Sequence, residues 1–168
     1  IVGKQPFAND SKESTPREKG AWLFLGRIAG NKGHVNLVKL FAKARNIDPS
    51  CASKLFIVGN HDPSDPYFQE LIRQIELLDL ASHVTLTGKV SDDEVEHYLA
   101  TASVYVSMSQ HEGFGVPLIE AAHHGLPVVA LRNSAVGETL GHGSCLADTP
   151  DEMINFIQKI LSDNDLYQ

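Results

Sequence analysis

A strand, a glycine-rich turn, a helix and a second strand are encoded in residues 104–131, VYVSMSQHEGFGVPLIEAAHHGLPVVAL. The apolar run at 104–107 predicts a buried strand, and the turn after it leads into a helix over residues 117–124. Gly125 ends this helix, and the apolar run at 127–131 predicts the next strand. Strands without polar alternation, joined by a helix, are typical of a parallel sheet covered on both faces.

Two glutamates surround the start of this helix: Glu112 falls in the turn, and Glu120 falls about one helical turn inside the helix. A glycine-rich turn before a helix lets backbone N–H groups and the positive helix end approach an anion. Carboxylates beside it can accept hydrogen bonds from sugar hydroxyls, and His111 lies in the same turn. The segment therefore predicts a site for a ligand with both phosphate and hydroxyl groups. An acid–base pair that hydrolyses a glycosidic bond is an alternative interpretation.

The same alternation of apolar runs and helical periodicity continues through the chain. Further strands are expected at residues 21–25, 55–58, 83–87 and 144–147, and further helices at 34–46, 67–78, 91–101 and 150–161. In the helix at 67–78 we expect Leu71, Ile75 and Leu78 to face the core, and Ser91 with Glu94 predicts a capping box. The fold class is therefore α/β, a Rossmann-like parallel sheet of about six strands with helices on both faces. Residues 1–20 are polar and are interpreted as a linker or lead-in, so that 21–168 form one domain.

Ligands of such sheets bind beyond the carboxyl ends of the strands, where the strand order reverses. In the order 3-2-1-4-5-6, the strands at 21–25 and 104–107 flank that point, so the loops at 26–33 and 108–115 would face one crevice. The first loop begins at Gly26 and carries Arg27 and Lys32, whose charges suit phosphate oxygens. It matches neither the P-loop nor the dinucleotide-binding fingerprint. An ordinary turn with solvated cations is the alternative.

Composition excludes several classes of protein. With 21 acidic and 14 basic residues among 168, the net charge of -7 argues against a nucleic-acid partner. The two cysteines form no CxxC pair, which fits a reducing compartment, and we expect a cytoplasmic location that includes the inner face of the membrane. No apolar run approaches the roughly 20 residues of a membrane span. Because no metal-binding motif is present, we expect neither a metal nor a cofactor.

Five segments together resemble a known family, and they are FLGR…KG at residues 24–33, FIVG at 56–59, TGKV at 87–90, EGFG…EA at 112–121 and GLPVVA at 125–130. In this order they are similar to the C-terminal, donor-binding domain of the GT-B fold retaining glycosyltransferases of family 4. The resemblance covers residues 21–161 and rests mainly on the combination of the two glutamates with the upstream arginine and lysine.

This resemblance implies a role for each matching residue. Arg27 and Lys32 would neutralise the donor diphosphate, Glu112 would contact the transferred sugar, and Glu120 would bind the ribose hydroxyls. The three catalytic residues expected on this basis are Arg27, Lys32 and Glu112. The remaining donor contacts are expected from Gly26, Lys89, Val90, His111, Gly113, Phe114, Gly115 and Glu120. The family often has two glycines before the glutamate that follows strand 5, whereas Gly137 alone precedes Glu138 here, so the role of Glu138 stays open.

The resemblance also implies partners. A nucleotide-diphosphate sugar such as a UDP- or GDP-sugar would be the donor, and the acceptor would be a glycan, a lipid or a cell-surface polysaccharide. The acceptor-binding N-terminal domain of the family would precede Ile1, so we expect the isolated domain to be inactive, and membrane contact would be peripheral and made through the missing domain. Two alternatives stay open: another GT-B enzyme such as a nucleotide-sugar epimerase, and a non-catalytic α/β binding module.

Overall fold

The computed structural model describes residues 16–110, 115–132 and 144–163. It contains one sheet in the order β3-β2-β1-β4-β5-β6, in which every strand pair is parallel. The strands are β1 (Ala21–Leu25), β2 (Lys54–Val58), β3 (Val84–Leu86), β4 (Val104–Ser107), β5 (Val128–Leu131) and β6 (Ser144–Ala147). The expected α/β fold and the expected strand order are both confirmed.

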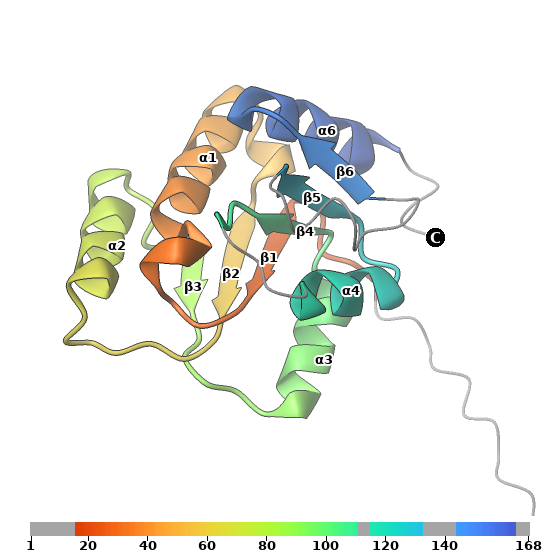
Figure 1. The fold of residues 1–168 in the computed structure, drawn as a ribbon. Helices are drawn as coiled ribbons and strands as arrows, with labels where there is room; N and C mark the ends of the chain where they lie inside the picture. Colours follow the sequence, from red (N-terminus) through yellow and green to blue (C-terminus); the bar gives the residue numbers. More distant parts are fainter. Residues whose placement is uncertain (1–15, 111–114, 133–143, 164–168) are drawn as a thin grey trace, which may run out of the picture.

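Helices cover both faces of this sheet (Figure 1). The described helices are α1 (His34–Ile47), α2 (Pro66–Leu77), α3 (Asp92–Thr101), α4 (Val116–His123) and α6 (Pro150–Ser162), with short 3-10 turns η1 (Gly30–Lys32) and η2 (Pro49–Cys51). Helices α1, α2 and α6 lie on one face, whereas α3 and α4 lie on the other. Each described helix follows a strand, so its N-terminus lies at the edge of the sheet where the strands end.

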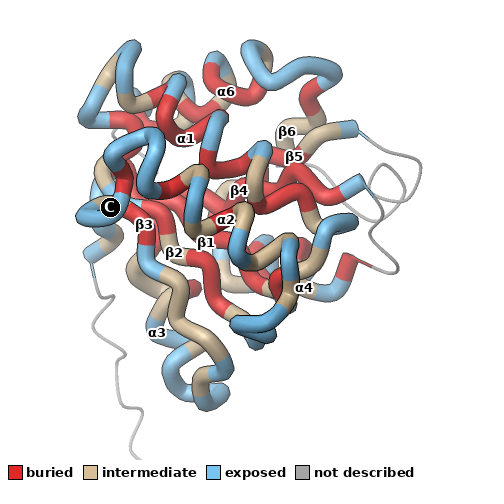
Figure 2. The backbone as a smooth tube through the Cα atoms, turned by 90° about the vertical axis from the view of Figure 1, so that its left-hand side faces the viewer, coloured by how far each residue is buried: buried red, intermediate tan, exposed pale blue. Residues whose placement is uncertain are grey.

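The core consists of two apolar clusters, one on each face of the sheet. The larger cluster joins Trp22, Phe24 and Phe41 with residues of α2 and α6, and the smaller one joins Leu23 and Tyr105 with residues of α3 and α4. All five residues of β1 are buried because this strand lies in the middle of the sheet and is covered on both faces. Figure 2 shows the buried residues running along the strands, with exposed residues on the outer sides of the helices.

Two details of the predicted helices can be compared with the structure. The capping box is confirmed, since Ser91 Oγ accepts from the Glu94 amide and the Glu94 carboxylate accepts from the Ser91 amide. The inward placement of Leu78 is wrong, because α2 ends at Leu77 and Leu78 is its exposed C-cap residue. Leu71 and Ile75, about two turns and one turn earlier, are buried as expected.

The residues just before β1 contact the helices through Arg17. Its guanidinium donates to the carbonyl oxygens of Leu99, Ala102 and His124 at 3.0, 2.8 and 2.9 Å. These carbonyls lie at the C-terminal ends of α3 and α4, which lack intrahelical partners for their last C=O groups. Arg17 therefore joins the C-terminal ends of the two helices on this face, four residues before β1 begins.

Candidate functional site

The strands β1 and β4 separate at the carboxyl edge of the sheet. They pair with each other only at Trp22–Val104 and Leu23–Tyr105. Beyond these pairs β1 continues alongside β2 to Leu25, whereas β4 continues alongside β5 to Ser107. The switch point expected from the strand order therefore lies between the ends of these two strands.

The loop after β1 is held against the chain that follows β4. The Gln110 amide donates to the Asn31 carbonyl oxygen at 3.0 Å, and the Ser109 hydroxyl donates to the Lys32 carbonyl oxygen at 3.4 Å. Gly33 ends this loop with a φ of 70°, and a Cβ atom there would lie 2.3 Å from the Met108 carbonyl oxygen. Only glycine fits this contact, so the two loops meet as expected from the strand order.

The loops after β2 and β3 join the same edge. A Cβ atom on Gly59 would lie 2.1 Å from the Gly26 carbonyl oxygen, so the second loop packs directly under the first. The Gly59 amide also donates to the Gly88 carbonyl oxygen at 3.2 Å, and the Ile28 amide donates to that of Asn60 at 2.9 Å. The loops that follow β1, β2, β3 and β4 thus form one surface lined by backbone atoms. Glycine at Gly33 and Gly59 allows these loops to approach one another closely.

Two helices begin at this surface. Both α1 and α4 start after a glycine in the left-handed region, Gly33 with φ 70° and Gly115 with φ 64°, and neither glycine supplies a side-chain cap. In α1 the Val35 amide already donates to the Tyr67 hydroxyl at 3.2 Å. The positive ends of two helix dipoles consequently lie at this edge of the sheet, where they favour an anion.

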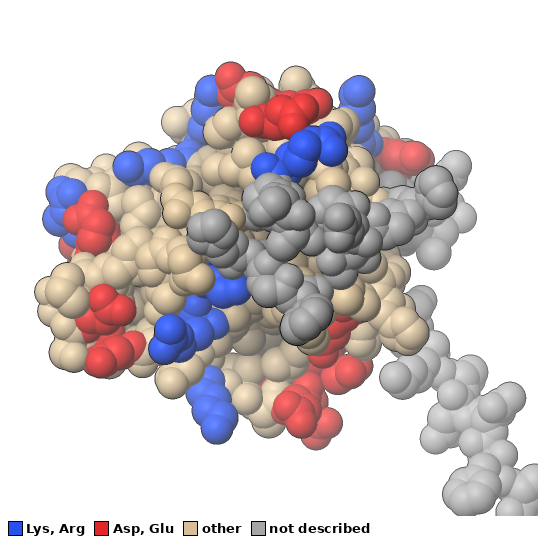
Figure 3. Space-filling view, viewed as in Figure 1, with Lys and Arg blue, Asp and Glu red and all other residues tan. Residues whose placement is uncertain are grey.

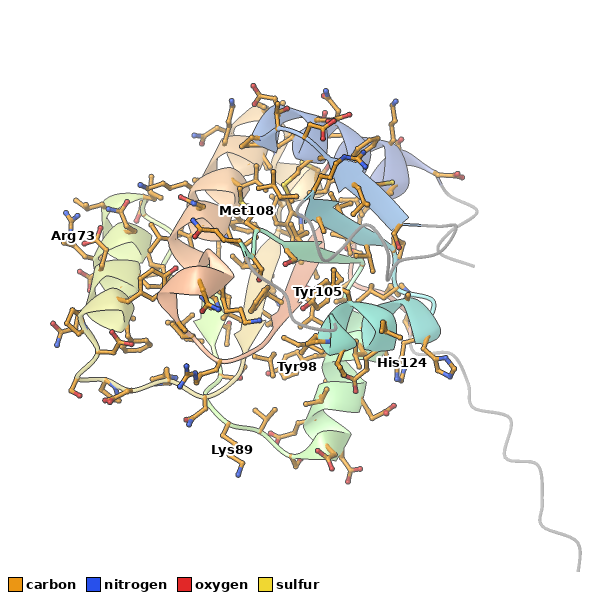
Figure 4. All side chains as sticks on the ribbon, viewed as in Figure 1. Arg73, Lys89, Tyr98, Tyr105, Met108 and His124 are labelled. Carbon is orange, nitrogen blue, oxygen red and sulfur yellow. The ribbon has the colours of Figure 1, made fainter. Side chains whose placement is uncertain are left out.

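The predicted site residues within the described ranges come from three loops and one helix. Arg27 is exposed and Lys32 is half-buried in the loop after β1, whereas Lys89 is exposed in the loop after β3. Val90 packs on the smaller core cluster, and Glu120 is half-buried in the middle of α4. Figure 3 shows basic side chains gathered around the loop after β1, and Figure 4 places Lys89 on the outer side of its loop.

Other predicted contacts fall outside the described residues. These are His111, Glu112, Gly113 and Phe114, together with Glu138. Their roles, like those of the residues that are described, stay predictions.

His34, the first residue of α1, has no role predicted from the sequence. The structure buries this side chain completely, with its ring edge-on to Phe24 at a centroid distance of 4.7 Å. Burial, helped by the charge of Lys32, lowers the pKa of His34 from 6.5 to about 4, although the Ala29 carbonyl oxygen, which favours the protonated ring, acts in the opposite direction. The imidazole directly behind the loop of Arg27 and Lys32 is therefore neutral at pH 7. A histidine that opens an amphipathic helix on its inner face is the sequence signal that could have identified it.

Two features are absent from the described part of the chain. Within residues 16–110, 115–132 and 144–163, no group of three or more histidine, cysteine, aspartate or glutamate side chains is placed to hold a metal ion. None of the helices in these ranges is long and apolar enough to cross a membrane. The expectation of a metal-independent site stays a prediction.

Comparison with known families and curated proteins identifies relatives. The model of the family "Glycosyl transferases group 1" matches residues 7–168. The 2-deoxystreptamine N-acetyl-D-glucosaminyltransferase of Niallia circulans is 34% identical over 138 residues, which are 82% of this chain and 34% of that protein. A GDP-mannose-dependent alpha-(1-6)-phosphatidylinositol monomannoside mannosyltransferase of Mycobacterium tuberculosis is 28% identical over 159 residues, covering 88% of this chain and 40% of that protein. The chain thus spans well under half the length of these two relatives.

Solved structures share the fold. Anabaena HepE in complex with UDP and glucose superposes with a TM-score of 0.72 at 23% identity, covering 89% of this chain and 40% of that one. The C-terminal domain of the group 1 glycosyl transferase LpcC from Francisella tularensis superposes with a TM-score of 0.71 at 21% identity, covering 90% of this chain and 80% of that one. The six-stranded sheet is therefore the fold of GT-B glycosyltransferase structures.

Proposed function

The chain belongs to the glycosyl transferases group 1 family, and we propose that it is the C-terminal, donor-binding domain of a retaining glycosyltransferase of family 4. The observation that carries this proposal is the junction of the loops after β1 and β4. There Lys32 directly precedes the start of α1 in the loop that also carries Arg27, and this loop is hydrogen-bonded to Ser109 and Gln110, at the point where β1 and β4 separate.

The charge at this junction suits a diphosphate leaving group. Cleavage of the bond between sugar and phosphate builds negative charge on the leaving diphosphate. Arg27, Lys32 and the positive ends of α1 and α4 would stabilise that charge in the transition state without a metal ion. In a retaining reaction at one face of the sugar, the leaving phosphate helps to deprotonate the acceptor, so this chain need not supply a general base.

The remaining donor contacts are proposed from the positions that match the family. Glu112 would bind the transferred sugar, and the half-buried Glu120 would bind the ribose hydroxyls from α4. Lys89 and Val90 would lie beside the base, since their loop packs against the loop after β2 at Gly59 and Gly88. HepE in complex with UDP and glucose and the GDP-mannose-dependent mannosyltransferase support a UDP- or GDP-sugar as the donor class.

The acceptor would be bound elsewhere in the full-length protein. Because the chain corresponds to 34% of the Niallia enzyme and 40% of the mycobacterial one, acceptor recognition is assigned to the N-terminal domain of the family. That acceptor is proposed to be a glycan or a lipid, with transfer at the cytoplasmic side of the membrane.

Titration of the 168-residue chain with UDP, GDP and ADP, followed by calorimetry or NMR, tests the donor site. We expect weak binding of at least one nucleotide, weakened about tenfold or more by Arg27→Ala or Lys32→Ala, because each removes a charged contact to phosphate. Lys54→Ala is the matched control, since Lys54 opens β2 at the opposite edge of the sheet and pairs with Glu18. No binding of any nucleotide, or equal binding in all three variants, would refute the proposal.

Two assays with the full-length protein separate the alternative functions. Incubation with the donor alone would yield an epimerised sugar if the protein were a nucleotide-sugar epimerase. If the chain were a non-catalytic module, Glu112→Ala would leave the rate of sugar transfer unchanged. If it is the proposed donor-binding domain, Glu112→Ala should remove most of the transfer rate.

A further inference from the structure

One buried hydroxyl bridges the two strands where they separate. Tyr105 lies in β4 with no exposed surface, and its ring stacks on Phe24 with centroids 6.1 Å apart. Its hydroxyl reaches the end of β1, where it accepts from the Leu25 amide and donates to the Leu25 carbonyl oxygen, both at 3.2 Å. Figure 4 shows Tyr105 inside the molecule, by the ribbons of the central strands.

This pair of hydrogen bonds takes the place of backbone hydrogen bonds between β1 and β4. The backbone pairs between β1 and β4 end at Leu23–Tyr105, two residues before Leu25. A parallel neighbour would otherwise satisfy both the N–H and the C=O group of Leu25. Because β4 has turned towards β5 at this point, the phenol of Tyr105 supplies a donor and an acceptor in its place.

The residues that follow Leu25 are those of the proposed donor site. Gly26 and Arg27 come directly after it, and the Gly26 amide donates to the Val58 carbonyl oxygen on the β2 side at 2.9 Å. Tyr105 on one side and β2 on the other therefore hold the end of β1 from which the loop of Arg27 leaves the sheet.

We propose that Tyr105 is a positioning residue of the donor site, which acts by holding the end of β1 so that Arg27 reaches the diphosphate. The inference rests on the proposed function, because it needs a nucleotide bound at the loop after β1. Tyr105 itself need not touch the donor, since it is buried in the cluster beneath α3 and α4.

Ser103 offers a matched control in the same pair of strands. It is also fully buried, directly before the first residue of β4, and its hydroxyl donates to the Ala21 carbonyl oxygen at 3.0 Å. This bond lies at the start of β1, four residues before Leu25. Tyr105→Phe and Ser103→Ala each remove one buried hydroxyl between β4 and β1, but only the first does so beside the proposed site.

The first measurement needs no nucleotide. In Tyr105→Phe we expect amide hydrogen exchange of Leu25, Gly26 and Ile28 to be about tenfold faster than in the unsubstituted chain, because the Leu25 amide loses its acceptor and its neighbours lose their anchor. Ser103→Ala should leave these three amides unchanged. Equal exchange of these amides in both variants would overturn the positioning role.

The second measurement is nucleotide affinity under conditions where each variant is fully folded. We expect Tyr105→Phe to raise Kd roughly three- to tenfold and Ser103→Ala to leave it within about twofold. In an Arg27→Ala background the effect of Tyr105→Phe should fall below about twofold, because the residue acts through that loop. A normal Kd in Tyr105→Phe would overturn the inference alone, whereas absent binding by the unsubstituted chain would overturn the proposed function.

Discussion

Two glycines with almost the same backbone conformation provide a sharp test of how the loops meet. Gly33 has a φ of 70° and Gly125 a φ of 67°, so alanine would be strained to the same extent at both positions. Their surroundings differ, because a Cβ atom at Gly33 would lie 2.3 Å from the Met108 carbonyl oxygen, whereas one at Gly125 would meet nothing within 4 Å. We expect Gly33→Ala to destabilise the fold much more than Gly125→Ala.

The structure allows the difference to be estimated. The left-handed conformation costs alanine about 1 kcal/mol at either position. Ordinary contact of a Cβ atom begins at 3.4 Å, so Gly33→Ala must also push the chain after β4 away by about 1 Å. This movement breaks the hydrogen bonds from Gln110 to Asn31 and from Ser109 to Lys32, at about 1 kcal/mol each. Gly33→Ala should therefore cost about 3 kcal/mol and Gly125→Ala about 1 kcal/mol.

Urea unfolding measures both values. Trp22 is the one tryptophan of the sequence and is fully buried, so its fluorescence reports global unfolding. Equal slopes of the free energy against urea would show that the denatured states are comparable. Losses that agree within about 0.5 kcal/mol would refute the reasoning, since they would mean that the chain after β4 does not pack on Gly33. Nucleotide binding should be lost in Gly33→Ala and retained in Gly125→Ala.

Two further predictions concern stability. Arg17→Ala should lower the free energy of unfolding by about 2 kcal/mol, because the carbonyl groups of Leu99, Ala102 and His124 lose a charged donor. Lys19→Ala, at an exposed position nearby, should change this free energy little, and equal urea midpoints of the two variants would contradict the prediction. The pKa of His34 is lowered to about 4 by burial, so protonation favours the unfolded chain, and the stability from this group is present above pH 6.5 and lost as the pH falls towards 4. The loss should reach up to about 3 kcal/mol, and His34→Leu should remove this slope from unfolding free energies measured between pH 7.5 and 4; an unchanged slope would show that His34 is not the group responsible.

Much of the fold could be predicted because its signals are local. Unbroken apolar runs such as 21–25 and 104–107 identify buried parallel strands, and the Ser91–Glu94 spacing identifies a helix start that the structure confirms. The predicted burial of Leu78 is wrong because a helical pattern does not show at which residue the helix ends. One residue beyond that end, the side chain no longer follows the buried face.

The same distinction between local signals and long-range contacts applies to the site. Arg27 and Lys32 are predicted as donor contacts from the sequence alone, because charged residues in a glycine-containing loop after a strand are visible without any long-range contact, and their role stays a prediction. The three carbonyl partners of Arg17 were not predictable, since they lie 82 to 107 residues away along the chain. The same holds for the burial of His34, which depends on packing against Phe24 and Tyr67.

The sequence by itself determined the type and order of the elements and the chemistry of the loops, because hydrophobic periodicity, glycine and charge act over a few residues. Only the tertiary structure decided how the strand ends meet. Gly33 lies close to Met108, and the Tyr105 hydroxyl bonds to Leu25 in place of a backbone partner. Both contacts join segments that are about 75 to 80 residues apart in the sequence. Such contacts depend on how two strands diverge within the packed sheet, and no local pattern encodes that geometry.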